Sequence, residues 1–183
     1  MDYYKEKQFI AQVDENDKIL GKIEKWEVHK KGILHRGFTA ILVYENQYLI
    51  QHRKHPVFDG VFDLSFSSHQ IYLGNDRLQD NNQAIWEGLK REWNLEKKDL
   101  LFEPKLLKKI YYKAKDPNSD FTEHEIDYIY EVEIKKLPSP NYSFCYGFSL
   151  VPKKNFLKSK VYSLTSKILA PWIKIMIEKN TIR

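Results

Sequence analysis

The sequence contains a single cysteine, Cys145, and no apolar run approaches the roughly 18 residues of a membrane-spanning helix. One thiol cannot form an internal disulfide, and it cannot build a cysteine-based zinc site. The first eight residues are mostly polar, so they do not contain the apolar region of a signal peptide. These absences predict a soluble, cytoplasmic protein without a membrane partner.

The composition is that of a globular protein, with 42% apolar and 30% charged residues. A chain of 183 residues predicts a single domain over residues 1–183, because a domain takes about 150 residues. The net charge is +5, but the lysine pairs are scattered rather than gathered in runs. This pattern indicates a solvated surface and favours an anionic small ligand over nucleic acid. We expect a monomer or a homodimer.

Alternating or β-branched segments predict most of the strands. These segments are residues 8–13, 19–21, 35–44, 48–51, 105–112 and 125–134. Turn formers at 14–17 and 45–47 predict two antiparallel hairpins. Residues 138–140, Pro-Ser-Pro, mark a loop.

Two segments carry the signature of a helix. Ile85, Leu89 and Trp93 fall at helical spacing within residues 81–95, and Asp80 is a candidate N-cap. Residues 163–179 predict a C-terminal amphipathic helix that starts anew after Pro171. Residues 22–31 are left without an assignment. The order of elements predicts an α/β (α+β) fold in which a mixed β-sheet is sandwiched between α-helices.

Acidic residues and histidines are the candidates for chemistry. Glu92 lies at the margin of the apolar stripe of its helix, where a buried carboxylate is costly unless it is paired or binds a metal. Glu123 and Glu125 point to the same face of a strand, although such pairs are also common on exposed strands. Three histidines join them as candidate ligands or as structural side chains: His29, His35 and His69. The other three, His52, His55 and His124, are expected at the surface.

Motifs spread over nearly the whole chain carry a family resemblance. In order they are residues 13–17 (VDEND), His29, 32–38 (GILHRGF), 49–53 (LIQHR), 58–62 (FDGVF), 67–70 (SSHQ), the helix 84–95, Tyr112, 123–125 (EHE) and 170–172 (APW). In this order they resemble type I isopentenyl-diphosphate isomerases, which have the Nudix fold.

The resemblance implies a role for each matched residue. Three histidines and two glutamates would hold one divalent metal: His29, His35, His69, Glu123 and Glu125. This donor set suits Mn²⁺ or Mg²⁺, and Zn²⁺ is also compatible with it. Glu92 would help to hold a second Mg²⁺ that arrives with the substrate. Lys25, Arg53 and Lys54 would bind the diphosphate, and Tyr112 would deliver a proton together with Glu125.

Aromatic side chains are the candidates for the pocket wall. They are Trp26, Phe58, Phe66 and Trp172. Aromatic residues at these positions also suit a packed core.

The chain departs from the family pattern at the centre of the site. Ser67 stands where the isomerases have a catalytic cysteine, and a hydroxyl is a much weaker acid than a thiol. Leu64 and Gln70 replace an asparagine and a proline that flank this cysteine. In the helix that carries the Nudix motif, acidic or basic family residues are replaced at three positions: Glu87, Gly88 and Arg91.

Three functions are compatible with this sequence. The first is an enzyme of the isomerase type that acts on a small isoprenoid-like diphosphate by adding and removing protons. The second is a Nudix pyrophosphohydrolase for a nucleoside or prenyl diphosphate, and the third is an inactive diphosphate-binding homologue. The five-ligand set is kept better than the Nudix motif, which favours the first.

Overall fold

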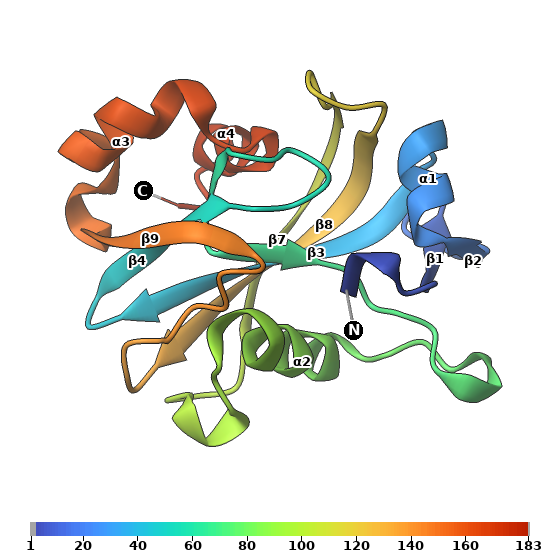
Figure 1. Cartoon of the computed structure of the whole chain (residues 1–183), viewed down its shortest axis with the longest axis horizontal. Coiled ribbons are helices and arrows are strands. Elements are labelled where there is room, and N and C mark those ends of the chain that lie inside the picture. The colour runs from blue at the N-terminus through green and yellow to red at the C-terminus, as the bar shows by residue number, and fades with distance from the viewer. Residues whose placement is uncertain (1–2, 183) are drawn as a thin grey trace.

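The computed structural model describes residues 3–182 and arranges them around a nine-stranded sheet (Figure 1). The strands are β1 (Phe9–Val13), β2 (Ile19–Glu24), β3 (His35–Tyr44), β4 (Gln47–Arg53), β5 (Phe62–Asp63), β6 (Phe66–Ser68), β7 (Lys105–Lys115), β8 (Thr122–Ile134) and β9 (Cys145–Pro152). The α-helices are α1 (Lys25–Lys31), α2 (Asn81–Trp93), α3 (Lys160–Thr165) and α4 (Pro171–Glu178). Short 3-10 turns are η1 (Tyr3–Lys5), η2 (Gly74–Asp76), η3 (Lys97–Asp99), η4 (Lys153–Lys158) and η5 (Ser166–Ile168).

The sheet is mixed because β3 pairs in both directions. Over its full length β3 runs parallel to β8, with His35 opposite Glu125. Along its other edge β3 pairs antiparallel with β1, β6 and β4 in turn. Strand β7 pairs antiparallel with β8 and places Tyr112 opposite Glu125. These pairings place His35, Glu125 and Tyr112 side by side on three adjacent strands.

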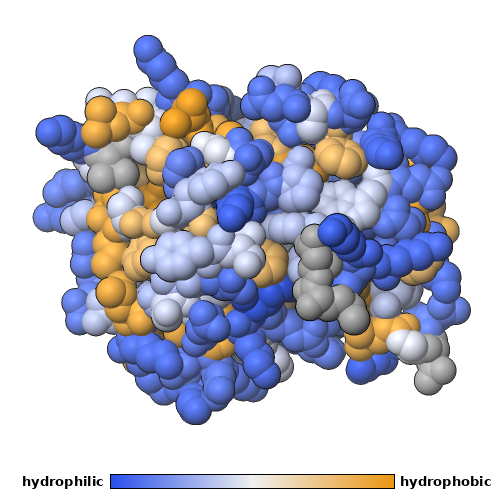
Figure 2. Space-filling view, viewed as in Figure 1, coloured by the Kyte–Doolittle hydropathy of each residue, from blue (hydrophilic) through white to orange (hydrophobic). Residues whose placement is uncertain are grey.

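The side chains of β3 point alternately to its two faces and so contribute to two separate hydrophobic cores. Phe38 and Leu42 belong to the core that packs against α2, whereas Ile41 and Val43 belong to the core on the side of α4. In Figure 1, α2 lies on one side of the sheet and α4 on the other, as the sequence predicts for a sheet between helices. Figure 2 shows the molecule from the same direction, with mainly hydrophilic side chains in the lower part of the view, where α2 lies.

Both predicted helical segments form helices, with different limits. The Asp80 carboxylate caps α2 by accepting from the Gln83 backbone N–H, and Asn94, with φ of 50°, ends the helix before residue 95. The predicted helix 163–179 is two helices. Helix α3 ends at Thr165, and α4 begins at Pro171, because proline suits the first turn of a helix but not its interior.

One helix and three strands of the structure are not among the elements predicted from the sequence. Residues 25–31 form α1, whose start is capped by Glu24 and whose end is marked by Gly32 with φ of 60°. Strands β5, β6 and β9 were also not predicted. The first two have only two and three residues, too few for a periodic pattern.

Within residues 3–182, no helix combines the length and the apolar character that crossing a membrane requires.

Candidate active site

Three imidazoles and two carboxylates converge where α1, β3, β6 and β8 meet. His29 Nε2 lies 3.2 Å from Glu123 Oε2, and His35 Nε2 lies 3.9 Å from the same oxygen. His35 Nε2 and His69 Nε2 lie 3.4 and 2.9 Å from Glu125 Oε1. Ligand atoms of His29, His35, His69 and Glu123 all lie within 4.8 Å of one another. The structure thus brings together the five side chains that the resemblance selects.

The backbone orients two of the imidazoles toward the centre of the cluster. His29 Nδ1 donates to the Lys25 carbonyl one helical turn earlier. His35 Nδ1 donates to the Ile33 carbonyl at 2.8 Å. In both rings Nδ1 therefore carries a proton, and Nε2 faces the carboxylates. This is the orientation in which a histidine binds a metal through Nε2 once that nitrogen has lost its proton.

Atoms without partners show that the cluster fits a divalent cation. His35 Nε2 and Glu123 Oε2 are buried and have no hydrogen-bond partner among residues 3–182. Such atoms are costly to bury unless something outside the chain binds them. A divalent cation with oxygen and nitrogen ligands would satisfy both atoms.

The electrostatics of the cluster favour ionised carboxylates. Burial would raise the pKa of Glu125, but the adjacent imidazoles of His35 and His69 hold it well below its ordinary value. Burial also opposes ionisation of Glu123, yet the charge of His29 lowers its pKa. Burial lowers the pKa of His69 to about 4, despite the opposing effect of Glu125. At neutral pH, His69 is therefore a neutral ring with a lone pair to offer.

Tyr112 completes the cluster on the side of α4. Its hydroxyl donates to Glu125 Oε2 at 2.5 Å. Burial, followed by the negative charge of Glu125, raises the pKa of Tyr112 well above its ordinary value, so the phenol keeps its proton. The Trp172 ring lies 5.7 Å from the Tyr112 ring, between centroids.

A glycine in β3 makes room for this arrangement. A Cβ atom built on Gly37 would lie 2.4 Å from Glu125 Oε1. Residue 37 shares the face of His35, two positions earlier on the strand. Any larger side chain at residue 37 would displace the Glu125 carboxylate from the histidines.

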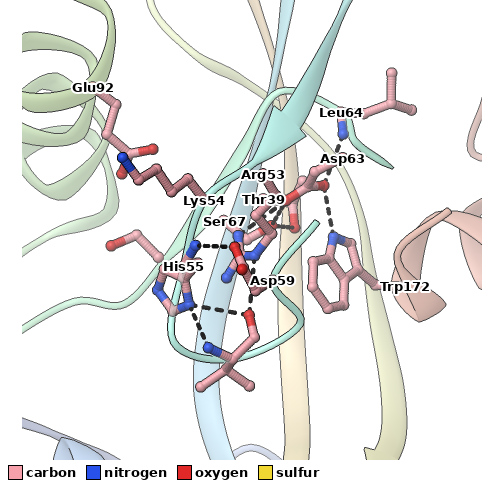
Figure 3. A network of polar contacts seen from close by, with 12 residues as sticks. Thr39, Arg53, Lys54, His55, Asp59, Asp63, Leu64, Ser67, Glu92 and Trp172 are labelled. Carbon is pink, nitrogen blue, oxygen red and sulfur yellow. Dashed lines mark hydrogen bonds and ion pairs between the residues drawn. The ribbon is translucent and has the colours of Figure 1, made fainter. Parts of the chain in front are cut away.

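Ser67 takes part in a partly buried chain of hydrogen bonds (Figure 3). Its hydroxyl donates to Asp63 Oδ2 at 3.1 Å and lies 2.9 Å from Thr39 Oγ1. Thr39 Oγ1 also lies 2.9 Å from Asp127 Oδ2. Each hydroxyl has one proton to donate, so these three contacts require a third proton from a carboxylic acid.

The two acids at the ends of this chain differ in their partners. Asp63 also accepts from Trp172 Nε1 at 2.8 Å and from Arg53 Nη1 at 3.3 Å. Burial, followed by the charge of Glu125, raises the pKa of Asp127 well above its ordinary value. Burial raises the pKa of Asp63 as well, although the charge of Arg53 opposes this, and the Ser67 hydroxyl donates its proton to Asp63. None of Thr39, Asp63 and Asp127 was selected from the sequence, because only the folded sheet brings them together.

A cavity next to the cluster contains several predicted site residues. Its lining includes Lys25, Arg53, Ser67, Glu92 and Trp172, together with the cluster residues His69, Tyr112, Glu123 and Glu125. His55, expected at the surface, also lines it, since its ring folds back against the Val57 backbone. Tyr3, Tyr4 and Arg91 line it as well and were not selected from the sequence.

Several predicted residues lie elsewhere. Lys54 is exposed and donates to the Tyr142 carbonyl at 3.2 Å, outside the cavity lining. Trp26 donates to the Tyr4 carbonyl and packs near Phe121. Two further aromatics are core residues rather than pocket wall: Phe58 packs against Trp172, and Phe66 packs in the core beneath α2. Of the predicted aromatic wall, Trp172 alone is part of the cavity lining.

One departure from the Nudix motif in α2, at Gly88, coincides with a steric constraint. A Cβ atom on Gly88 would lie 2.4 Å from Cε2 of the Phe66 ring, so this position admits no side chain. Glu92 is buried and forms an ion pair with Arg91, at 2.7 Å between Nη2 and Oε1. Glu92 lies outside the group of mutually close ligand atoms, so its role toward a second Mg²⁺ stays a prediction.

In sequence, the chain resembles curated isopentenyl-diphosphate isomerases. It is 25% identical to isopentenyl-diphosphate delta-isomerase 2 of Homo sapiens over 189 residues, which cover 96% of this chain and 83% of that protein. It is 29% identical to isopentenyl-diphosphate Delta-isomerase I of Clarkia breweri over 64% of this chain and 45% of that protein. No protein-family model matches the chain.

In structure, the chain resembles Nudix proteins. A protein from Deinococcus radiodurans superposes with a TM-score of 0.56 at 16% identity, covering 88% of this chain and 99% of the other. A MutT NUDIX hydrolase from Burkholderia pseudomallei gives a TM-score of 0.51 at 14% identity, covering 75% and 98%. The chain has the Nudix fold, and its sequence resembles isopentenyl-diphosphate isomerases.

Proposed function

We propose, from the Nudix fold and the resemblance to isopentenyl-diphosphate isomerases, that this chain is a metal-dependent enzyme that moves a double bond in a small isoprenoid-like diphosphate. The observation that carries this proposal is the group of three histidines with Glu123, next to Glu125, which contacts His35 and His69 and accepts from Tyr112. Proton addition and removal at a carbon–carbon double bond needs a proton donor and an acceptor, and both can be named here.

Glu125 and Tyr112 are the proposed proton-donating pair. The Tyr112 hydroxyl is fixed on Glu125 Oε2, on the carboxylate whose other oxygen faces His35 and His69. Mg²⁺ or Mn²⁺, held by His29, His35, His69, Glu123 and Glu125, would supply positive charge that offsets the two adjacent carboxylates. Ser67 is the proposed acceptor on the other side of the substrate, with Asp63 behind it.

Lys25 and Arg53 are proposed to bind the diphosphate. Both line the cavity, and both residues are buried, with relative exposures of 3% and 4%. Charge-assisted hydrogen bonds from buried cations are strong because water does not compete for them. The cytoplasmic location, the absence of a nucleic-acid partner and the monomeric or dimeric state remain predictions.

Isopentenyl diphosphate and Mg²⁺ in D₂O test the reaction. Proton NMR is expected to show deuterium entering the C5 skeleton and dimethylallyl diphosphate accumulating. The variant Glu125→Gln keeps the size of the side chain but removes its charge and its ability to accept and pass on the Tyr112 proton, so it is expected to lose this activity.

Two other results would contradict the proposal. Release of phosphate or a monophosphate from a panel of nucleoside and prenyl diphosphates, without isomerisation, would assign the chain to the pyrophosphohydrolases. Thermal stabilisation by Mn²⁺ or a diphosphate, without turnover of any substrate, would indicate a binding protein that has lost the chemistry.

A further inference from the structure

Arg91 lies at the edge of the cavity where α2 passes β6. It follows Gly88 by three residues, so it lies on the same side of the helix. Its Nη2 lies 3.4 Å from the Ser68 hydroxyl. Ser68 also lines the cavity, on the side of β6 that faces α2. The Arg91 side chain has a relative exposure of 20%, so the guanidinium is largely shielded from bulk water.

The guanidinium of Arg91 has a hydrogen-bond donor without an acceptor among the described residues. Nη2 donates to Glu92 Oε1 at 2.7 Å. Nε is buried and has no hydrogen-bond partner among residues 3–182. The Tyr3 ring covers the guanidinium, with 4.2 Å between the ring centroid and Cζ. A buried N–H without an acceptor is costly, which indicates that an acceptor from outside the chain belongs there.

The other two cations of the cavity are engaged within the chain. Arg53 donates to Asp63 and to the Val57 carbonyl, each at 3.3 Å. Lys25 Nζ donates to Gln8 Oε1 at 3.3 Å and lies 4.8 Å from the centroid of the Tyr3 ring. Arg91 thus differs from both in carrying a buried donor that the described chain leaves unpaired.

We propose that Arg91 binds the anionic group of the substrate, a role that no resemblance assigns to it. The inference rests on the proposed function, since it places the diphosphate in the same cavity. Phe66 leaves no room for a side chain at Gly88, so Arg91 is the next position on that face of α2 that can present a cation. Its guanidinium already holds the Glu92 carboxylate, so we assign the counter-charge at this edge to Arg91 rather than to a Mg²⁺ at Glu92.

Binding of methylenediphosphonate to the full chain tests this proposal without turnover, since its P–C–P bridge resists hydrolysis. Isothermal titration calorimetry is expected to show at least tenfold weaker binding by Arg91→Met, because a charge-assisted, fork-shaped donor is lost. Lys90→Met removes an exposed cation from the same helix and is expected to bind within twofold of the wild type. Unchanged binding by Arg91→Met, or no binding by the wild type, would overturn the proposal.

A second pair of titrations separates Arg91 from a metal at Glu92. Glu92→Gln frees the guanidinium, so it is expected to bind methylenediphosphonate at least as tightly as the wild type, with Mg²⁺ or with EDTA. Weaker binding by Glu92→Gln that appears only with Mg²⁺ would overturn the proposal in favour of a metal held by Glu92. Thermal unfolding of each variant shows whether it is folded. If methylenediphosphonate binds tightly through Arg91 but no isomerisation occurs, the anion-binding role of Arg91 is supported and the proposed function is contradicted. The two proposals can therefore fail separately.

Discussion

The same three strands carry two polar clusters of different character on their opposite faces. On one face β3, β8 and β7 contribute His35, Glu125 and Tyr112 to the candidate metal centre. On the other face their neighbours Arg36, Tyr128 and Lys109 surround the carboxylate of Asp17. The alternation of side chains along each strand assigns one cluster to each face.

Every charge in the Asp17 cluster has a partner within the chain. Arg36 Nε and Lys109 Nζ each donate to the Asp17 carboxylate at 2.8 Å, and the Tyr128 hydroxyl donates to it as well. Burial would raise the pKa of Asp17, but these hydrogen bonds from Lys109, Tyr128 and Arg36 lower it. The cluster ties the β1–β2 turn to the sheet and leaves no acceptor of Asp17 for a ligand.

The candidate metal centre shows the opposite pattern. His35 Nε2 and Glu123 Oε2 face each other at 3.9 Å and have no hydrogen-bond partner in residues 3–182. A structural cluster gains stability by satisfying its own atoms, whereas a binding site keeps atoms available. The difference between the two faces lies in this availability and not in the number of charges.

The largest expected effect separates the two faces by metal affinity. Glu123→Gln removes an anionic ligand and is expected to weaken Mn²⁺ binding at least about 100-fold. Even the loss of a residue that only hydrogen-bonds to a metal ligand lowers metal affinity about 10–100-fold. Competition with a chelator measures the affinity. Asp17→Asn, on the other face, is the control and should bind Mn²⁺ like the wild type. Equal affinities in all three proteins would refute the assignment of Glu123.

Stability is expected to respond in the reverse way. Asp17→Asn keeps a residue that tolerates the left-handed backbone at φ of 65°, but it loses the charge that three donors share. We expect a loss of about 2 kcal/mol in the free energy of unfolding at pH 7. Glu15→Gln, at an exposed position of the same turn, is expected to change the stability little.

The pH dependence of this loss has a defined sign. The folded pKa of Asp17 is lower than its ordinary value of 3.8, so the unfolded chain binds the proton more tightly. The stabilisation is therefore complete above pH 3.8 and disappears as the pH falls through the folded pKa. Urea unfolding at pH 7 and pH 3 checks this, and a difference between Asp17→Asn and wild type that does not shrink on acidification would contradict it.

A smaller effect is expected from the glycine that makes room for Glu125. Gly37→Ala places a methyl group against the carboxylate and is expected to cost about 1.5 kcal/mol of stability and to weaken Mn²⁺ binding. Gly21→Ala, in β2, meets nothing within 4 Å and serves as the control in the same thermal and metal titrations. If both variants behaved alike, the close approach of Gly37 to Glu125 would carry no functional meaning.

The smallest expected effect concerns Ser67. Ser67→Cys introduces a group with a pKa near 8.5 and is expected to raise the rate of isomerisation about tenfold, because a thiolate forms far more readily than an alkoxide. NMR of dimethylallyl diphosphate formation measures the rate. A variant that still binds Mn²⁺ but isomerises no faster would locate the limit elsewhere in the site, for example at Leu64 or Gly88.

The sequence could predict what depends on local pattern or on motif. The hairpin of β3 and β4 follows from a β-branched run and a turn, and α2 from apolar spacing and the Asp80 cap. The pairing of His29, His35, His69, Glu123 and Glu125 followed from the family resemblance, since no local rule joins residues so far apart in the chain.

What could not be predicted depends on contacts between distant segments. Asp63 and Asp127 come from β5 and β8 and meet only through Ser67 and Thr39. In the sequence, Arg91 has the pattern of an ordinary surface residue. Only the contact between Gly88 and Phe66 shows that this side of α2 packs closely against β6. Helix α1 was within reach, because Glu24 and Gly32 are cap residues at the correct spacing, but its seven residues are too short for a periodic pattern.

Anomalous diffraction from crystals grown with Mn²⁺ tests the central claim most directly. The account predicts a manganese peak bound by the imidazoles of His29, His35 and His69 and by the carboxylates of Glu123 and Glu125. Ordered side chains with no anomalous peak between them, or a peak bound by other residues, would contradict it.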